Sequence, residues 1–312
     1  MTSLFLGLKN NNKMNQPLFG IDLGGTKIEG VVIASKSDPS VIARLRLPTE
    51  SAKGYQHIID QIAKVVSMLE ETANIKATKV GIGVPGTNDP VQGVHKNANT
   101  TCLNGQPFKK DLATRLGIEV NMANDANCFA IAEAILGAVP DVLPNAEVVF
   151  GVIMGTGVGG GVVFNRQVWN GRQGIGGEWG HNFLDASGGK CYCGQIGCIE
   201  TVISGPALER FYFSKTGVKK KLRNIMDSIE TDAAAKETKD RLMYFFGRAM
   251  ATIVNILDPD AIVIGGGVGN ISELYTEGVV EVAKYVFNPR LDTVFLKPKL
   301  GDSAGVFGAA LL

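Results

Sequence analysis

One histidine and three cysteines, all able to bind a metal ion, lie within residues 181–198, in the stretch GEWGHNFLDASGGKCYCGQIGCIE. They are His181, Cys191, Cys193 and Cys198. Three thiolates and one imidazole form a closed four-coordinate set, which is the composition of structural Zn²⁺ sites, whereas a catalytic zinc needs an open position for water. A redox disulfide is disfavoured because the C-x-C spacing closes a strained loop. Buried free cysteines remain the alternative, and we predict a structural zinc site whose tight turns use Gly189, Gly194 and Gly197.

Three glycine-rich turns at the ends of predicted strands could bind phosphate groups. They contain Gly24 and Gly25; Gly155, Thr156 and Gly157; and Gly265, Gly266 and Gly267. Glycine exposes backbone N–H groups that approach phosphate oxygens closely. Near the first turn, Asp22 is an acid of the kind that commonly helps to place Mg²⁺, while Thr26 and Lys27 suit phosphate oxygens. Any one turn could be an ordinary hairpin, but three at strand ends favour a nucleotide site.

The GTGVGG segment at 155–160 formally matches the dinucleotide-binding fingerprint G-x-G-x-x-G. That fingerprint needs a helix to begin at its last glycine, whereas the residues that follow, GVVFNRQVW, are β-branched and aromatic and predict a strand. A nicotinamide-dependent oxidoreductase is therefore disfavoured. A Walker A sequence and the H-R-D loop of protein kinases are also absent from the sequence.

Predicted strands and helices alternate along the chain. Aliphatic residues around the first glycine turn predict a strand, a turn and a strand over 16–34, and helical spacing of apolar residues predicts helices over 57–73 and 272–287. Segments 19–33 and 150–164 match without gaps at glycine and aliphatic positions, which indicates a duplicated unit rather than two unrelated glycine hairpins. The pattern predicts an α/β fold of two related lobes with a cleft between them, in which ligands bind at the carboxyl ends of strands.

The segments DLGGTK, GTGVGGG, GEWGH and CYCGQIGCIE together resemble the ROK family (repressors, open reading frames and kinases), from about Leu18 to the C-terminus. Kinases of this family have a duplicated actin-like, hexokinase-like ATPase fold. The resemblance implies a small N-terminal lobe of residues 18–123 plus 303–312 and a larger C-terminal lobe of residues 124–302 with the zinc-binding loop. The short apolar core and polar run at the N-terminus predict a disordered leader over 1–17. Within the family, KNANTTCLNGQPFKKDL, NDANC and NILDPD are most similar to bacterial manno(fructo)kinases.

The resemblance also implies which residues bind the sugar. The family's catalytic aspartate and a sugar-binding asparagine match Asp125 and Asn124, a pair that the residues alone would equally allow as a helix cap. Other sugar-contacting positions of the family match Gly86, Asn99, Glu178, His181 and Glu200. One ring nitrogen of His181 is expected to face the metal and the other the sugar, so that the zinc holds sugar ligands in place.

The predicted activity is ATP- and Mg²⁺-dependent phosphorylation of the 6-hydroxyl of a hexose, with fructose preferred and mannose or glucose as further acceptors. An N-acetylhexosamine kinase or a glucokinase is the alternative, because the segment between His181 and Cys191 is shorter than in manno(fructo)kinases and borders the sugar. A sugar-responsive ROK transcriptional regulator is disfavoured, since only seventeen residues precede Leu18. The family implies a homodimer.

The composition is that of an ordinary globular protein, with 45% hydrophobic residues among 312 and a formal net charge of +1. Without a basic excess, nucleic-acid binding is not expected. No apolar stretch approaches the roughly twenty residues of a membrane-spanning helix, and the N-terminus lacks the apolar core of a secretory signal. We therefore expect a cytoplasmic protein with a hexose and ATP as its partners.

Overall fold

The computed structural model describes residues 16–312, and these form two compact units. Unit 1 comprises the N-terminal part up to Ala132, Asn170–Gly176 and Asp302–Leu312; unit 2 comprises Glu133–Trp169 and Gly177–Gly301. The predicted leader over 1–17 lies outside the described residues, except for its last two positions.

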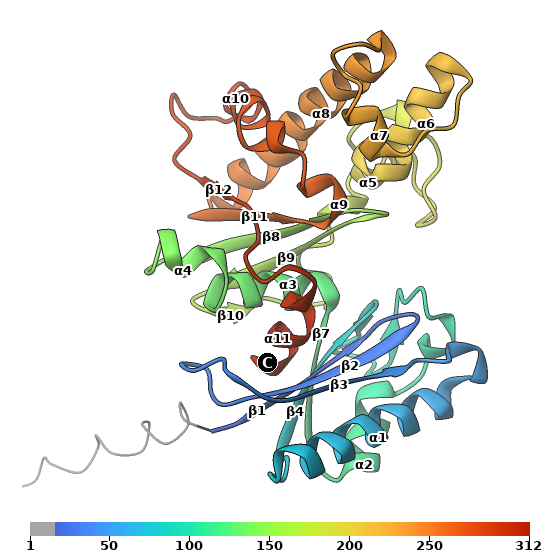
Figure 1. Cartoon of the computed structure of the whole chain (residues 1–312), viewed down its shortest axis with the longest axis vertical. Helices are drawn as coiled ribbons and strands as arrows, with labels where there is room; N and C mark the ends of the chain where they lie inside the picture. Colours follow the sequence, from blue (N-terminus) through green and yellow to red (C-terminus); the bar gives the residue numbers. More distant parts are fainter. Residues whose placement is uncertain (1–15) are drawn as a thin grey trace, which may run out of the picture. The chain divides into compact units, whose positions relative to one another are not determined.

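The sheet of unit 1 has the strand order β3-β2-β1-β4-β7. Its strands are β1 (Leu18–Leu23), β2 (Lys27–Ile33), β3 (Val41–Pro48), β4 (Lys79–Val84) and β7 (Glu119–Asn124). The first three strands are antiparallel, and β4 and β7 run parallel to β1. Helices α1 (Tyr55–Ala73) and α2 (Phe108–Leu116) lie on one face of this sheet and α11 (Ala304–Ala310) lies on the other (Figure 1). The predicted helix over 57–73 is confirmed as part of α1.

The sheet of unit 2 repeats this arrangement with the order β10-β9-β8-β11-β12. Its strands are β8 (Val148–Met154), β9 (Val158–Phe164), β10 (Gln167–Val168), β11 (Ala261–Gly265) and β12 (Val294–Leu296). Strand directions also correspond, since β10, β9 and β8 are antiparallel while β11 and β12 are parallel to β8. The two matching segments therefore form equivalent hairpins in equivalent sheets. The strand β9 follows the GTGVGG turn, as predicted, and no helix begins there.

The two equivalent hairpins differ by one residue in their turns. Leu23 pairs with Ile28 around the first turn, whereas Met154 pairs with Val158 around the second. The first turn is longer by the position of Lys27, a cation to which the second turn has no counterpart. The duplicated scaffold thus carries two chemically different glycine turns.

The remaining elements connect these sheets and cover their faces. The helices are α3 (Asp125–Ile135), α4 (Ala138–Val142), α5 (Ile199–Ile203), α6 (Gly205–Thr216), α7 (Leu222–Met226), α8 (Ala233–Leu257), α9 (Gly266–Gly269) and α10 (Glu277–Ala283), and a small hairpin joins β5 (Thr87–Asn88) to β6 (His95–Lys96). Short 3₁₀ helices are η1 (Ser51–Lys53), η2 (Thr101–Leu103), η3 (Trp179–His181), η4 (Ala186–Gly188), η5 (Ser272–Tyr275) and η6 (Gly301–Ser303). No helix within residues 16–312 is long and apolar enough to cross a membrane.

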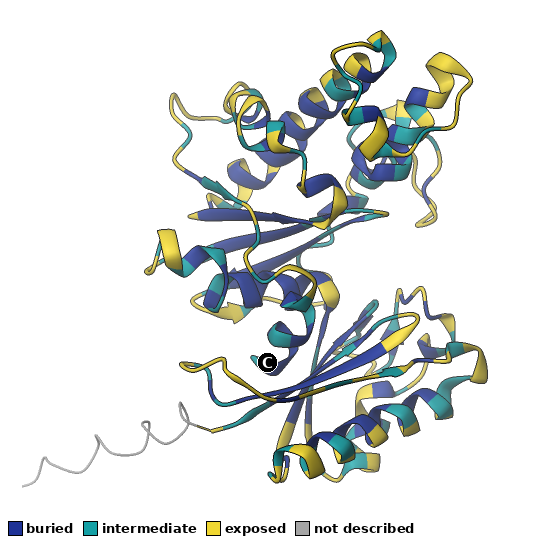
Figure 2. Cartoon of the chain, in the orientation of Figure 1, coloured by how far each residue is buried: buried dark blue, intermediate teal, exposed yellow. Residues whose placement is uncertain are grey.

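Buried residues concentrate on the strands and on the inward faces of the helices of each unit (Figure 2). Each unit has its own apolar core, one around β1, β4 and α1 and the other around β8, β11 and α8. Because each sheet has a separate core, its strand ends are fixed independently of the other unit. The turns that carry chemistry are therefore attached to rigid elements.

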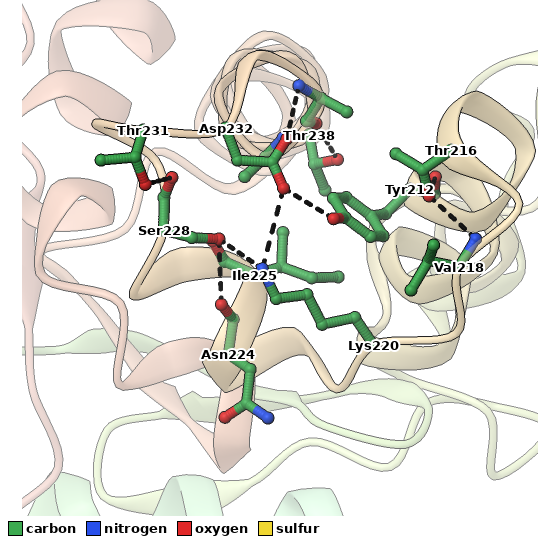
Figure 3. A network of polar contacts seen from close by, with 12 residues as sticks. Tyr212, Thr216, Val218, Lys220, Asn224, Ile225, Ser228, Thr231, Asp232 and Thr238 are labelled. Carbon is green, nitrogen blue, oxygen red and sulfur yellow. Dashed lines mark hydrogen bonds and ion pairs between the residues drawn. The ribbon is translucent and has the colours of Figure 1, made fainter.

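A polar network fixes the connection from α6 to α8 in unit 2 (Figure 3). The hydroxyl of Tyr212 donates to Asp232 at 2.6 Å, and Lys220 donates to Ser228 at 2.7 Å and lies 3.7 Å from Asp232. Asp232 also caps α8 by accepting from the backbone N–H groups of Ala234 and Ala235. The network holds α6, whose first residue contacts the second glycine turn.

The expected boundary between lobes at residue 124 stays a prediction; the helix that follows it packs Cys128 against Gly83 and Gly308, which belong to unit 1. One sequence prediction differs from the structure. The helix predicted over 272–287 is broken into η5 and α10, since Thr276 has φ −122° and ψ −81°, outside the helical region.

Candidate active site

Asp22 lies at the carboxyl end of β1, in a narrow space. A Cβ atom on Gly305 or Gly83 would lie 3.2 or 3.5 Å from a carboxylate oxygen of Asp22, so the two glycines leave just enough room for this side chain. Burial, followed by the negative charges of Asp125 and Glu29, raises the pKa of Asp22 to about 6. Asp22 is therefore a crowded carboxylate that a bound divalent cation would stabilise.

The first glycine turn is exposed at Gly25, Thr26 and Lys27. It is closed by a hydrogen bond from the Gly24 N–H to the Lys27 carbonyl at 2.9 Å. A Cβ atom on Gly25 would meet no atom within 4 Å, so the chain's own packing does not require this glycine. The absence of a side chain keeps the backbone N–H groups accessible to a ligand.

The ammonium group of Lys27 lies 3.3 Å from a carboxylate oxygen of Glu29. Glu29 is 1% exposed and also binds the guanidinium groups of Arg44 and Arg46. Burial alone would raise the pKa of Glu29, but hydrogen bonds from Arg46 and Arg44 lower it overall, so that Glu29 stays charged. This ionised, immobile carboxylate orients Lys27, and it was not identified from the sequence because its partners lie on β3.

Asn124 and Asp125 are adjacent residues at the point where β7 ends and α3 begins. Asn124 ends β7 and accepts a hydrogen bond from the Asn127 N–H at 2.7 Å, which makes it the cap of α3. Asp125 begins the helix, and its side chain is exposed at the surface. The surrounding protein nevertheless raises the pKa of Asp125 by desolvation. Asn124 thus provides the cap, while Asp125 Oδ1 accepts the Ala126 N–H at 2.8 Å and the residue remains exposed.

Gly86 and Asn99 are brought together in unit 1. Gly86 has φ +75°, and a Cβ atom there would lie 2.4 Å from the Lys96 carbonyl oxygen, so the segment that leads to Asn99 crosses directly over this glycine. Asn104 holds the segment by hydrogen bonds to the backbone of Ala98 at 2.9 and 3.0 Å. Since Val84 is paired with Asn124, Gly86 also lies close to the end of β7.

The second and third glycine turns meet in unit 2. A Cβ atom on Gly155 would lie 3.8 Å from the backbone nitrogen of Gly267, and the Gly155 carbonyl accepts from the Gly205 N–H at 2.8 Å. Gly266 has φ +83° and starts α9 rather than an open turn. Thr156, Gly266 and Gly267 are exposed. The second and third glycine turns therefore lie together within unit 2, and the first turn lies in unit 1.

Glu200 connects the second glycine turn, Gly155–Gly157, to the segment that carries the three clustered cysteines, 191–198. Its Oε2 atom accepts a hydrogen bond from the Val158 N–H at 3.0 Å, directly after the turn. A Cβ atom on Gly157 would lie 2.5 Å from the same oxygen, so only glycine fits at this position without moving Glu200. A cavity of about 400 Å³ lies beside Glu200, and the residues that line it include Thr156, Lys190, Tyr192, Glu200 and Arg210.

Glu178 and His181 are positioned by the buried residue between them. Trp179 is 7% exposed and packs edge-on against Phe150, with ring centroids 6.0 Å apart. Trp179 also contacts Gly160 of β9, where a Cβ atom would lie 2.4 Å from the indole. This anchors η3 on the sheet, with Glu178 as its N-cap and His181 as its last residue.

The four predicted metal ligands are brought together, with all four ligand atoms within 4.8 Å of one another. His181 Nδ1 lies 3.6 Å from Cys191 Sγ, and Cys193 Sγ lies 3.6 Å from Cys198 Sγ. A tetrahedral zinc with ordinary bond lengths separates nitrogen and sulfur by about 3.5 Å and two sulfurs by about 3.8 Å. The geometry is therefore compatible with a structural zinc ion. The glycines expected to form the turns all have positive φ, namely Gly189, Gly194 and Gly197.

Tyr192, which lies between Cys191 and Cys193 in the sequence, contacts the second ring nitrogen of His181, Nε2. Its hydroxyl lies 3.1 Å from His181 Nε2, and the two rings meet edge to face at 5.2 Å. Tyr192 was not among the site residues predicted from the sequence. The C-x-C spacing was the only sign of its position in the sequence, because a residue between two ligands of one metal must also lie close to the remaining ligands of that metal.

The comparisons with known proteins agree with this architecture. A profile of the ROK family matches residues 18–312. The chain belongs to the ROK family. An N-acetyl-D-glucosamine kinase of Vibrio atlanticus is 35% identical over 305 residues, which cover 94% of this chain and 98% of that protein. A ROK hexokinase from Thermus thermophilus has 31% identity and a TM-score of 0.83, with 95% and 97% of the two chains covered.

A ROK glucokinase from Streptomyces griseus, solved with glucose and AMPPNP, has 27% identity and a TM-score of 0.74, with 95% and 98% of the chains covered. The predicted ROK family and the predicted actin-like, hexokinase-like fold are thus confirmed. The expectation of fructose as the preferred sugar gains no support, because these relatives are named for N-acetyl-D-glucosamine, hexoses and glucose.

Each unit of this ROK protein brings some of the predicted site residues together. Unit 1 brings Asp22 close to Asp125, and it brings Gly86 to the segment that carries Asn99. Unit 2 gathers the metal ligands, Glu200 and the two glycine turns.

Proposed function

We propose that this ROK protein is an ATP-dependent kinase that phosphorylates the 6-hydroxyl of N-acetyl-D-glucosamine. The observation that carries the proposal is the 35% identity to an N-acetyl-D-glucosamine kinase over nearly the whole of both chains. The 31% and 27% identical hexokinase and glucokinase favour glucose as a second acceptor. The assignment to an ATP:sugar phosphotransferase rests on all three relatives and does not depend on which sugar is preferred.

Asp125 is the proposed general base. Phosphoryl transfer depends mainly on positioning and charge stabilisation, so the base orients the attacking hydroxyl and accepts its proton. The exposed carboxylate of Asp125 is fixed at the start of α3, and desolvation raises its pKa towards the range in which a base works well near neutral pH. Asn124, Gly86, Asn99, Glu178, His181 and Glu200 are the proposed sugar-binding residues.

The three glycine turns are the proposed nucleotide-binding elements. Exposed backbone at Gly25, Thr156 and Gly267 is suited to phosphate oxygens, and Lys27 is held by Glu29 beside the first turn. Asp22 is the residue that would hold Mg²⁺, because its crowded carboxylate fits a divalent cation. When bound, Mg²⁺ would neutralise charge on the phosphate chain.

A structural Zn²⁺ is the proposed occupant of the His181 and cysteine cluster. Its four donors are of the right kind and separation, and a closed set of ligands leaves no position for substrate. The ion would order a loop of little apolar content that carries His181 at one end and Glu200 at the other. The predicted homodimer stays a prediction, which light scattering on the purified protein can test.

An ADP-release assay with a panel of sugars tests the proposal. We expect kcat/KM to be highest for N-acetyl-D-glucosamine, lower for glucose, and lowest for fructose and mannose. Asp125→Asn serves as the control for contaminating kinases, since it keeps the shape of the side chain and removes the base. Turnover of fructose above N-acetyl-D-glucosamine would overturn the choice of sugar, and turnover of none of the sugars would overturn the kinase assignment.

A further inference from the structure

We propose that the hydroxyl of Tyr192 competes with the sugar for the Nε2 proton of His181 and thereby sets the affinity of the enzyme for its acceptor. This inference rests on the proposed function, which makes the sugar the second partner of His181. It assigns a specificity-determining role to the residue between Cys191 and Cys193.

The orientation of the imidazole leaves a single nitrogen for other partners. Nδ1 of His181 faces the metal ligands, 3.6 Å from Cys191 Sγ. An imidazole that binds a metal through Nδ1 carries its proton on Nε2, where it acts as a donor. Nε2 lies 3.1 Å from the Tyr192 hydroxyl, which therefore accepts this hydrogen bond. One N–H group makes one good hydrogen bond, so the phenol oxygen and a sugar oxygen cannot both receive it.

The side chain of Tyr192 is held in a way that allows its displacement. It is 81% exposed, and within residues 16–312 its hydroxyl has no hydrogen-bond partner other than His181. Its neighbours Cys191 and Cys193 belong to the ligand set, so the backbone is fixed while the side chain can rotate. Moving the phenol away therefore costs one exposed hydrogen bond and one edge-to-face ring contact.

The position of Tyr192 places this competition where the acceptor is expected. Tyr192 lines the same cavity as Glu200 and Thr156, a proposed sugar ligand and a residue of the second phosphate turn. Any sugar that uses His181 must first replace the phenol oxygen. The measured affinity is then the difference between two hydrogen bonds, and an acceptor without a well-placed oxygen does not displace Tyr192.

The variant Tyr192→Phe removes the hydroxyl and keeps the ring contact with His181. Without the competing oxygen, we expect the Kd for N-acetyl-D-glucosamine, measured by calorimetry without nucleotide, to fall roughly two- to tenfold, the range of one net hydrogen bond. KM for the sugar should fall with it, while kcat and KM for ATP stay unchanged. The matched control is Tyr244→Phe, another exposed tyrosine whose hydroxyl contacts Arg248 on α8, and it should alter none of these values.

Zinc content and thermal stability of Tyr192→Phe separate competition from a structural role. Competition predicts native zinc content and native Tm, whereas loss of zinc would show that Tyr192 supports the ligand His181 and would overturn the inference. A Kd that is unchanged or higher in Tyr192→Phe also overturns it. If no sugar of the panel binds either protein, the proposed function fails and the inference fails with it, whereas equal Kd values in the two proteins contradict the inference alone.

Discussion

The substitution Gly157→Ala tests whether Glu200 links the second glycine turn to the sugar-binding residues. The new methyl group would lie 2.5 Å from Oε2 of Glu200, a distance that carbon and oxygen atoms do not tolerate. Because the oxygen is the end of a flexible side chain, Glu200 rather than the turn is expected to move. Its hydrogen bond from the Val158 N–H, now 3.0 Å long, would then be lost.

The size of the effect follows from this displacement. An ordinary contact of about 3.5 Å requires the oxygen to retreat by about 1 Å. A hydrogen bond to a charged acceptor contributes about 1.5–3 kcal/mol, and a misplacement of about 1 Å can reduce catalysis by up to about a hundredfold. We therefore expect kcat/KM for N-acetyl-D-glucosamine to fall by about ten- to a hundredfold.

A double-mutant cycle with Glu200→Ala identifies the cause of that loss. Steady-state ADP release is measured for the wild type, both single variants and the double variant. In the Glu200→Ala background, Gly157→Ala should cost less than about twofold, since the colliding carboxylate is gone. Native activity of Gly157→Ala, or an equal loss in both backgrounds, would refute the reasoning.

Three further predictions concern the base, the crowded carboxylate and the metal. Asp125→Asn should lower kcat by about 10²–10⁴-fold with KM for ATP unchanged in steady-state kinetics, and near-native turnover would remove Asp125 as the base. The pKa of Asp22 is raised from 3.8 to about 6, so the folded protein binds this proton more tightly than the unfolded chain and loses stability as the pH rises through that interval. Without added Mg²⁺, Asp22→Asn should therefore have a higher Tm than the wild type at pH 8 but not at pH 4. An equal difference in Tm at both pH values would contradict this. Removal of zinc by a chelator should lower both Tm and sugar affinity in calorimetry while AMPPNP still binds, whereas zinc-free protein with native sugar affinity would show that the metal does not position the sugar ligands.

The sequence was most informative where a residue type and its spacing determine a local geometry. The His181 and cysteine cluster needed no long-range information, because ligands close in sequence on a glycine-rich loop can reach one metal without help from the rest of the fold. The two glycine hairpins were recognisable for the same reason, and their matching glycine and aliphatic positions correctly indicated a repeated sheet, although their turns differ by one residue.

Contacts between distant segments could not be predicted from those local patterns. Glu29 holds Lys27 with the help of Arg44 and Arg46 on a different strand, and nothing in the spacing of these residues shows that they share one carboxylate. The contact of Glu200 with Val158 likewise joins residues 42 positions apart. The packing of Cys128 against Gly83 and Gly308 also joins segments that are remote in sequence.

The choice of sugar depends on the same kind of long-range geometry. Fructose was expected from segments such as KNANTTCLNGQPFKKDL, NDANC and NILDPD, whose resemblance to manno(fructo)kinases does not fix where the single polar atoms around a sugar lie. Acceptors are distinguished by the position of single polar atoms, where a difference of about 1.4 kcal/mol changes the preference tenfold. The hydroxyl oxygen of Tyr192, which lies 3.1 Å from His181 Nε2, is the atom that we propose for this role, and motif matching did not reveal it.

The proposed activity is the transfer of a phosphoryl group from ATP to the 6-hydroxyl of N-acetyl-D-glucosamine. ³¹P and ¹³C NMR of the product formed from these two substrates shows which hydroxyl is phosphorylated, and kcat/KM is measured beside glucose under the same conditions. We expect N-acetyl-D-glucosamine 6-phosphate as the product and a higher kcat/KM than for glucose. A phosphate on another hydroxyl, or no phosphorylated sugar in the presence of ATP and Mg²⁺, would refute the proposed activity.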